Sequence, residues 1–277
     1  MKKQSKRLVA ISFVFIMLVT TFCFVACSPY SGHYEQVGED ELESKSEELE
    51  RLVNKTVNSM LWNDLMPNYK AVYTISEKTE YLNPKFSTET EIKVVKYGYE
   101  GLTQSQIEFH KIQLTNETEF LILGEDPVLE EINFTVTFWY GEELENTYYE
   151  LVIDGKKEQD VLLYSYGRDE LKMASHYDEF FQRHIRSDIE TALTFDYKLY
   201  FDGENKIKID SIANESMEKW TILAYLIISD NDTVYYKETE EHNQKNRGHV
   251  DWDYYSKSAL EITPSTTKIT LPNFANS

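Results

Sequence analysis

The chain has 277 residues, of which 48 are acidic and 28 basic, so its net charge at neutral pH is −20. This charge disfavours nucleic acid and anionic lipid as partners of the chain as a whole, because both would repel it. Aromatic residues make up 14% of the sequence and include 20 tyrosines. Such residues favour pleated, half-buried strands.

The first 26 residues differ from the rest of the chain. They contain no acidic residue and four basic ones, so the remaining chain has a net charge near −24. The uncharged run Leu8–Ala26 follows the basic start and leads to Cys27. A basic start, an apolar run and small residues at its end are typical of a secretory signal peptide. The basic residues are Lys2, Lys3, Lys6 and Arg7. Because basic residues stay inside, the body of the protein is expected outside the cytoplasm.

The residues Val25-Ala26-Cys27, which follow a hydrophobic residue, resemble the lipobox of bacterial lipoproteins. The resemblance implies that residues 1–26 are a cleaved signal peptide and that Cys27 becomes a diacylated N-terminus anchored in the cell membrane. One alternative is an uncleaved transmembrane anchor, because the run of 19 residues can just span a bilayer. Another is a plain signal peptide that is cut elsewhere and releases a soluble protein. In the lipoprotein, no thiol remains for a disulfide, a metal or catalysis.

A tether and a helix are predicted next. Residues 27–38 are mostly small and polar without a period, which predicts a tether. Residues 39–66 show apolar residues at helical spacing, which predicts an amphipathic helix. Its apolar stripe either packs on the following domain, which we favour, or forms a coiled stalk or a partner-docking arm. The stripe consists of Leu42, Leu49, Leu52, Val53, Val57, Met60 and Leu61.

The remainder of the chain predicts a mainly β fold. Residues 69–167 alternate between polar and apolar, or form short apolar runs such as Phe120–Leu123, and predict a β-rich domain of about seven antiparallel strands. Asp154-Gly155 between two such runs predicts a hairpin. Residues 168–190 return to helical spacing and predict a connecting helix, and residues 191–277 predict a second, sandwich-like β-domain. The expected architecture is therefore one or two antiparallel immunoglobulin- or fibronectin-like sandwiches with an N-terminal and a connecting helix.

His249, Asp251 and Asp253 are the strongest candidates for a metal site. Their spacing of two places all three on one face of a strand, while Val250 and Trp252 face the core. Imidazole and carboxylates can bind Zn²⁺, Mn²⁺ or Ca²⁺, and His242 with Glu240 or Glu241 could add a ligand. The competing interpretation is a solvated strand face, which is favoured because same-face neighbours lie nearly 7 Å apart.

Catalytic signatures are scarce in this sequence. There is no His-Glu-x-x-His pattern, no complete nucleophile elbow and no glycine-rich phosphate loop. His184 and Asp188 are four apart on the predicted connecting helix and can pair, which favours an ion pair on the helix surface over a catalytic dyad. We therefore expect no enzyme activity and no cofactor.

Paired tyrosines place rings on both faces of the predicted strands. Tyr148-Tyr149, Tyr235-Tyr236 and Tyr254-Tyr255 each put one ring outward. An outward ring either covers the sheet or offers a platform for a glycan or a peptide. The function expected from all these features is a lipid-anchored, non-enzymatic binding or interaction module with a protein or glycan partner outside the cell. The alternatives are a metal-binding or metal-dependent hydrolytic lipoprotein and a structural subunit of an envelope complex.

Overall fold

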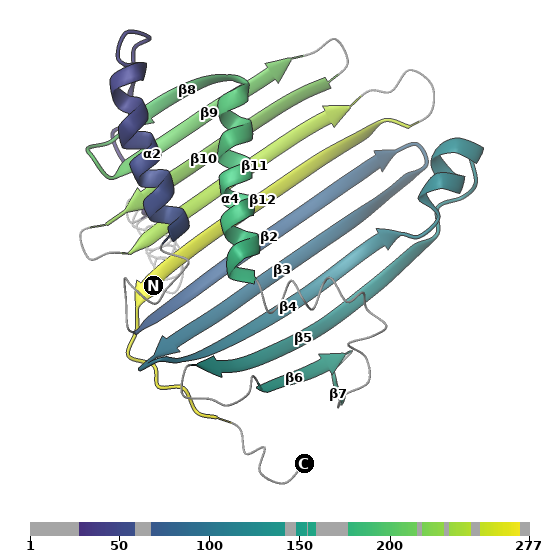
Figure 1. The fold of residues 1–277 in the computed structure, drawn as a ribbon. Helices are drawn as coiled ribbons and strands as arrows, with labels where there is room; N and C mark the ends of the chain where they lie inside the picture. The colour runs from purple at the N-terminus through teal and green to yellow at the C-terminus, as the bar shows by residue number, and fades with distance from the viewer. Residues whose placement is uncertain are drawn as a thin grey trace, which may run out of the picture.

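The fold is one large antiparallel sheet with two helices on one of its faces (Figure 1). The computed structural model describes residues 28–58, 68–141, 148–153, 155–158, 177–214, 218–229, 233–244 and 250–271. Their strands are β1 (Glu35–Gln36), β2 (Tyr69–Leu82), β3 (Lys85–Tyr99), β4 (Leu102–Leu114), β5 (Leu129–Gly141), β6 (Tyr148–Ile153), β7 (Lys156–Glu158), β8 (Asp196–Phe201), β9 (Lys206–Asn214), β10 (Glu218–Ile228), β11 (Val234–Gln244) and β12 (Trp252–Pro264). The helical segments are α2 (Leu42–Asn58), α4 (Tyr177–Thr194) and the single π-helical turn η2 (Glu119–Leu123).

The 12 strands lie in the order β1-β8-β9-β10-β11-β12-β2-β3-β4-β5-β6-β7. The prediction of a mainly β, antiparallel fold is confirmed. The immunoglobulin- or fibronectin-like sandwich is not confirmed, because the described strands join one sheet. The decisive pairing is between β12 and β2, which runs from Trp252↔Tyr81 to Pro264↔Tyr69. This long-range ladder unites strands from the predicted segments 69–167 and 191–277 in the same sheet.

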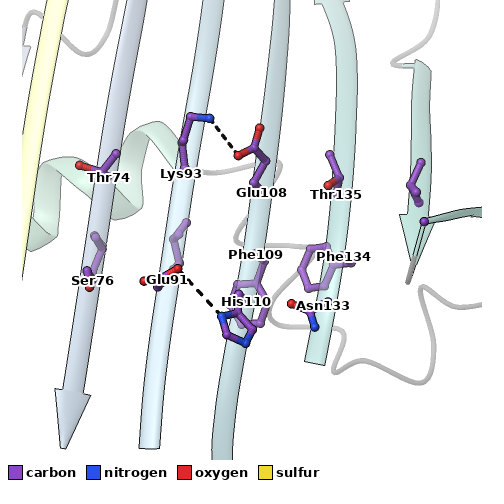
Figure 2. Close-up of a pocket in the computed structure, with 14 residues that line it drawn as sticks. Thr74, Ser76, Glu91, Lys93, Glu108, Phe109, His110, Asn133, Phe134 and Thr135 are labelled. Atoms are coloured by element: carbon purple, nitrogen blue, oxygen red, sulfur yellow. Dashed lines mark hydrogen bonds and ion pairs between the residues drawn. The ribbon is translucent and has the colours of Figure 1, made fainter. Parts of the chain in front are cut away.

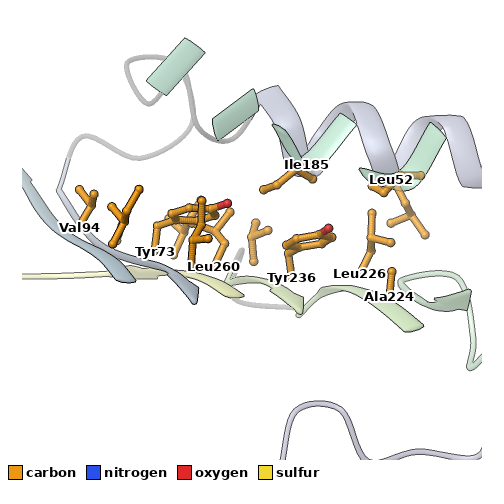
Figure 3. Close-up of a cluster of buried hydrophobic side chains, with 14 of the residues drawn as sticks. Leu52, Tyr73, Val94, Ile185, Ala224, Leu226, Tyr236 and Leu260 are labelled. Atoms are coloured by element: carbon orange, nitrogen blue, oxygen red, sulfur yellow. The ribbon is translucent and has the colours of Figure 1, made fainter. Parts of the chain in front are cut away.

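Helices α2 and α4 cover the inner face of the sheet, as we name this side. Leu52 of α2 and Ile185 and Ile189 of α4 are almost completely buried, and Figure 3 shows Leu52 and Ile185 pointing toward Tyr236 and Leu226 of the sheet. The first helix thus packs on the sheet, but it contacts β10 and β11 of residues 191–277 rather than the β-region that directly follows it in the sequence, which was the predicted partner. Residues 59–66 of its predicted range 39–66 lie outside the described residues, as do residues 168–176 of the predicted range 168–190, and α4 continues to Thr194.

The opposite side, which we name the outer face, carries the N-terminal segment of the described chain. Tyr30 packs edge-on against Tyr225 and Tyr235, and its hydroxyl donates a hydrogen bond to the backbone oxygen of Tyr236 at 3.2 Å. The segment then pairs with β8 through β1 and through the Val37 N–H, which donates to the Leu199 oxygen at 2.9 Å. We call residues 28–37 the strap. The segment predicted as a tether is therefore packed on the sheet over most of its length.

No helix in the described part of the chain combines the length and the apolar composition needed to cross a membrane. The uncharged run Leu8–Ala26 and Cys27 lie outside the described residues.

Candidate functional site

The predicted metal ligands are only partly visible. His249 lies outside the described residues, Asp251 directly precedes β12, and Asp253 is the second residue of β12. The backbone oxygen of Asp251 accepts a hydrogen bond from the Leu82 N–H at 3.0 Å, and Oδ1 of Asp253 accepts one from Asn243 at 2.9 Å. Within the described ranges, no group of three or more His, Cys, Asp or Glu side chains is arranged to hold a metal ion. The site of His249, Asp251 and Asp253 stays a prediction.

The predicted pair of His184 and Asp188 exists, and it belongs to a buried acidic cluster. His184 Nε2 lies 3.5 Å from Asp188 Oδ2, and both side chains are largely covered. Asp188 faces β11, where the Tyr236 hydroxyl lies 3.4 Å from Asp188 Oδ2 and donates to Glu238 Oε2 at 2.8 Å. Ser258 of β12 donates a second hydrogen bond to the same Glu238 oxygen at 3.2 Å. The helix is therefore joined to the sheet by a polar network inside an apolar interface.

Burial favours the uncharged forms of the titratable groups in and beside this cluster. Burial, with a hydrogen bond to Glu238 and the charge of Glu238, raises the pKa of Asp188 to about 9. Burial and the charges of Glu238 and Glu77 raise the pKa of Glu240 to about 7. Burial lowers the pKa of His184. At neutral pH a protonated Asp188 thus donates to Glu238, because two ionised carboxylates cannot share this low-dielectric position.

The cluster is suited to holding α4 rather than to processing a substrate. Glu238 and Tyr236 are 4% and 0% exposed, and their polar atoms bond to one another and to α4. A displaced pKa is also a feature of catalytic residues, but here the hydrogen bonds connect two structural elements. We conclude that the cluster sets the strength of helix docking.

A shallow hollow of about 610 Å³ lies over strands β2 to β6 (Figure 2). Thr74, Lys93, Glu108 and Thr135 form one row across it because they are direct partners in the strand register. Their chain neighbours on β2 to β5 are buried on the inner face, so this row belongs to the outer face. The next row contains Ser76, Glu91, His110 and Asn133.

The charged groups of the hollow are already paired with one another. Lys93 Nζ lies 2.9 Å from Glu108 Oε2. His110 lies between two carboxylates, with Nε2 at 3.4 Å from Glu131 and Nδ1 at 4.0 Å from Glu91. A ligand would have to compete with these pairs and with water on an open surface. The hollow therefore resembles a solvated sheet face more than a prepared binding site.

An apolar surface lies at one end of the sheet. Five of its side chains are large, hydrophobic and exposed, and we call them the apolar tip. They are Ile122 (74% exposed), Leu123 (68%), Val128 (53%), Leu82 (49%) and Leu129 (43%). They come from the β2–β3 turn and the β4–β5 connection, which lie side by side in Figure 1. Elsewhere in the described chain, Leu271 is the other large apolar side chain with comparable exposure.

Aromatic packing joins the two segments of the apolar tip. Phe120 of η2 is 4% exposed and packs edge-on against Tyr81 and Phe86, which stack on each other at 4.3 Å between centroids. The Thr115 N–H donates to the Val128 oxygen at 2.9 Å and closes the base of the connection. The exposure of Ile122 and Leu123 thus comes from an anchored turn. The apolar run Phe120–Leu123 is visible in the sequence, but its periodicity does not reveal that half of it faces solvent.

Comparisons with known proteins add no functional argument. No protein-family model and no curated protein matches the chain. Among solved structures, the chain is similar to Pseudomonas aeruginosa OccK2 (OpdF) in complex with glucuronate, with 10% identity and a TM-score of 0.20 over 72% of this chain and 61% of that one. A second structure of OccK2 (OpdF) shares 9% identity and the same TM-score, with coverages of 72% and 62%. The chain spans less than two thirds of the length of these structures, and the likeness is too weak to support a function.

Proposed function

We propose that this protein is a lipid-anchored extracytoplasmic bacterial lipoprotein that acts as a non-enzymatic interaction module and binds a protein partner through the apolar tip. The exposure of five large apolar side chains on two adjacent connections at one end of the sheet carries the proposal. Contiguous apolar surface rimmed by polar residues is characteristic of protein–protein contact sites. The tip is also anchored, so little conformational entropy is lost when a partner covers it.

The chemistry of the partner follows from the charges around the tip. Glu117, Glu119, Glu125 and Asp126 are exposed next to Ile122 and Leu123 along the chain. A complementary surface therefore has an apolar pocket for the two aliphatic side chains and basic residues around it. Anionic lipid fits the tip poorly, because four carboxylates would approach the headgroups with it.

A photo-reactive amino acid at Ile122 tests the interaction in living cells. We expect a discrete crosslinked partner, and the purified partner is expected to bind the Ile122→Ser, Leu123→Ser double variant roughly 10- to 100-fold more weakly than the wild type. This range corresponds to losing the burial of one or two aliphatic side chains. The quantity measured is the Kd of the purified pair by calorimetry.

Leu271→Ser provides the matched control for this measurement. Leu271 is an exposed leucine that follows the end of β12. The end of β12 pairs with Tyr69, the first residue of β2, whereas Leu82 of the apolar tip is the last residue of β2. Its replacement should leave the Kd unchanged. An unchanged Kd for the double variant, or an equal loss for Leu271→Ser, would contradict binding through the tip.

The anchor has its own test, which does not depend on the partner. Replacing Cys27→Ser removes the sulfur that the lipobox-type leader makes available for diacylation. We expect loss of metabolic labelling with a radioactive fatty acid and release of the protein from the membrane fraction. Persistent acylation of the Cys27→Ser protein would show that the lipid is attached elsewhere or that the anchor is of another kind.

A further inference from the structure

The strap determines where the membrane anchor emerges from the fold. Tyr30 is held on the outer face by its contacts with Tyr225 and Tyr235, and the Lys237 Nζ lies 5.5 Å from the centroid of its ring. Burial raises the pKa of Tyr30 to about 12, with a smaller contribution from the charge of Glu261. The ring is therefore a covered, neutral part of the outer surface. The described chain begins at Ser28, two residues before this ring, and therefore on the outer face and not on the helix side.

The distance between the anchor and this surface is short. Cys27 precedes Tyr30 by three residues, and an extended chain covers at most about 3.6 Å per residue, which limits the separation to roughly 11 Å. Ser28 shortens it further, because its backbone oxygen accepts a hydrogen bond from the Ser31 N–H at 3.0 Å in a turn. A lipid on Cys27 would therefore bring the bilayer surface close to the strands beneath the strap.

Lysines are concentrated on the outer face around the strap. The three rows nearest to it on strands β8 to β12 hold five lysines and two acids among their described residues. The register of the strands gives these as Lys198, Lys206, Lys208, Lys237 and Lys257 against Asp210 and Glu261. Asp202, which follows β8 beside the strap, is a third acid. Lys206 Nζ lies 3.2 Å from Asp202 and Lys208 Nζ lies 3.7 Å from Asp210, so Lys198, Lys237 and Lys257 carry most of the positive charge offered to a partner. Lys198, Lys237 and Lys257 are exposed, as are Asp210 and Glu261. This local excess of positive charge contrasts with the net charge of the chain.

On the helix side, the start of α2 carries charge of the opposite sign, whereas α4 exposes Arg183, Arg186 and Glu190. The start of α2 and the residues before it expose a dense set of carboxylates. These are Glu39, Asp40, Glu41, Glu43, Glu47 and Glu50. An anionic bilayer attracts lysines and repels carboxylates within about a Debye length. Charge and chain geometry thus favour the same orientation.

We propose that the outer face of strands β8 to β12, beside the strap, is the surface that rests on an anionic lipid bilayer. This inference relies on the proposed anchor at Cys27, and it adds a fixed orientation to it. The helices then face away from the membrane. The apolar tip lies beyond β12 in the sheet order, on strands β2 to β5, which leaves it at a distance from the lysine rows.

Single-cysteine labelling of the full lipidated protein tests the orientation. Cys27 would be acylated and Cys23 removed with the leader, so a cysteine introduced elsewhere is the only reactive thiol. Lys198→Cys and Lys257→Cys report the outer face, and Glu47→Cys and Glu190→Cys are matched controls at exposed positions of α2 and α4. Each variant carries an environment-sensitive fluorophore and is reconstituted in vesicles of phosphatidylcholine and phosphatidylglycerol with nitroxide-bearing headgroups.

The outer-face labels are expected to lose most of their fluorescence to the headgroup nitroxide, and the helix-side labels to keep it. Equal quenching of all four labels, or stronger quenching on the helices, overturns the orientation. Vesicle flotation of the same samples reports the anchor separately. If the protein floats with the vesicles but the helix-side labels are quenched more than the outer-face labels, only the orientation is refuted. If the protein carries no lipid and does not float with the vesicles, the proposed anchor is refuted, and the orientation with it.

A label at Leu123→Cys separates the orientation from the role of the tip. If the tip serves a protein partner, this label keeps its fluorescence in the vesicles while the outer-face labels are quenched. Quenching at Leu123 would instead make the tip a membrane contact, which contradicts the proposed partner. The Lys198→Gln, Lys237→Gln double variant should weaken quenching at Lys257→Cys in phosphatidylglycerol vesicles, and an unchanged signal would refute the role of the lysines.

Discussion

The free energy of unfolding is expected to fall as the pH rises from about 6.5 to 9, and the Asp188→Asn variant should lose much of this dependence. Asp188 has a pKa of about 9 in the folded state against its ordinary value of 3.8, and Glu240 has a pKa of about 7 against its ordinary 4.5. Between about pH 5 and its folded pKa, each group has released its proton in the unfolded chain but retains it in the folded protein. The contribution of these two groups to the free energy of unfolding is therefore fully present below their pKa values in the unfolded chain. It is lost as the pH rises through their pKa values in the folded protein.

The size of the slope is limited by the number of protons involved. Each retained proton changes the free energy of unfolding by at most about 1.4 kcal/mol per pH unit. His184 acts in the opposite direction, because its pKa is lowered by burial and its contribution is lost as the pH falls below about 6.5. The window between pH 6.5 and 9 thus isolates the carboxyl groups.

Urea unfolding at pH 6.5, 7.5 and 8.5 measures this effect. Asparagine mimics the protonated Asp188, so the variant should be more stable than the wild type at pH 8.5 by at least about 1.4 kcal/mol, the equivalent of one pKa unit. Glu190→Gln is the matched control, because Glu190 is exposed on the same helix. A slope that is the same in Asp188→Asn and wild type would show that Asp188 is ionised in the folded protein.

Replacing Leu52→Ala should cost roughly 2–5 kcal/mol of unfolding free energy, as is usual for a leucine removed from a packed core. Leu52 is completely buried where α2 meets the sheet and α4, so the substitution leaves a cavity between three elements. Glu47→Ala on the exposed side of the same helix should change stability by less than about 0.5 kcal/mol. Chemical denaturation monitored by circular dichroism measures both values.

This comparison also decides between two roles for α2. A core helix must lose stability when Leu52 is truncated, whereas a partner-docking arm loses only binding. Equal and small effects for Leu52→Ala and Glu47→Ala would show that α2 contributes little to the core. In that case the hypothesis of a docking arm would be favoured again.

Local features of the fold were predictable because they depend on short-range periodicity. The stripe with Leu49 and Leu52 identified α2, and the alternation along β2 to β5 identified strands. Tyr235 and Tyr236 do point to opposite faces, with Tyr236 buried and Tyr235 against the strap. The i, i+4 spacing of His184 and Asp188 predicted their pairing, but not their burial against β11.

Long-range features were not predictable in the same way. A sandwich and a single sheet share the same alternating pattern, and only the pairing of β12 with β2 distinguishes them. The acidic cluster combines Asp188 with Glu238 and Ser258 through contacts that cross 50 to 70 residues of sequence. The exposure of Ile122 depends on Phe120, which alone of this run packs deeply against Tyr81 and Phe86.

The sequence by itself predicted a leader ending at Cys27, and it determined the excess of acidic residues, the mainly β composition and the amphipathic character of the helices, because each depends on composition or on neighbours along the chain. The tertiary structure decided which strands pair, which carboxylates are buried together and which apolar side chains stay exposed. It also decided where the charges lie, because strand register brings lysines from β8, β9, β11 and β12 to the outer face. The net charge of −20 does not reveal this distribution. Register and packing are properties of the assembled sheet, and no short stretch of the chain encodes them.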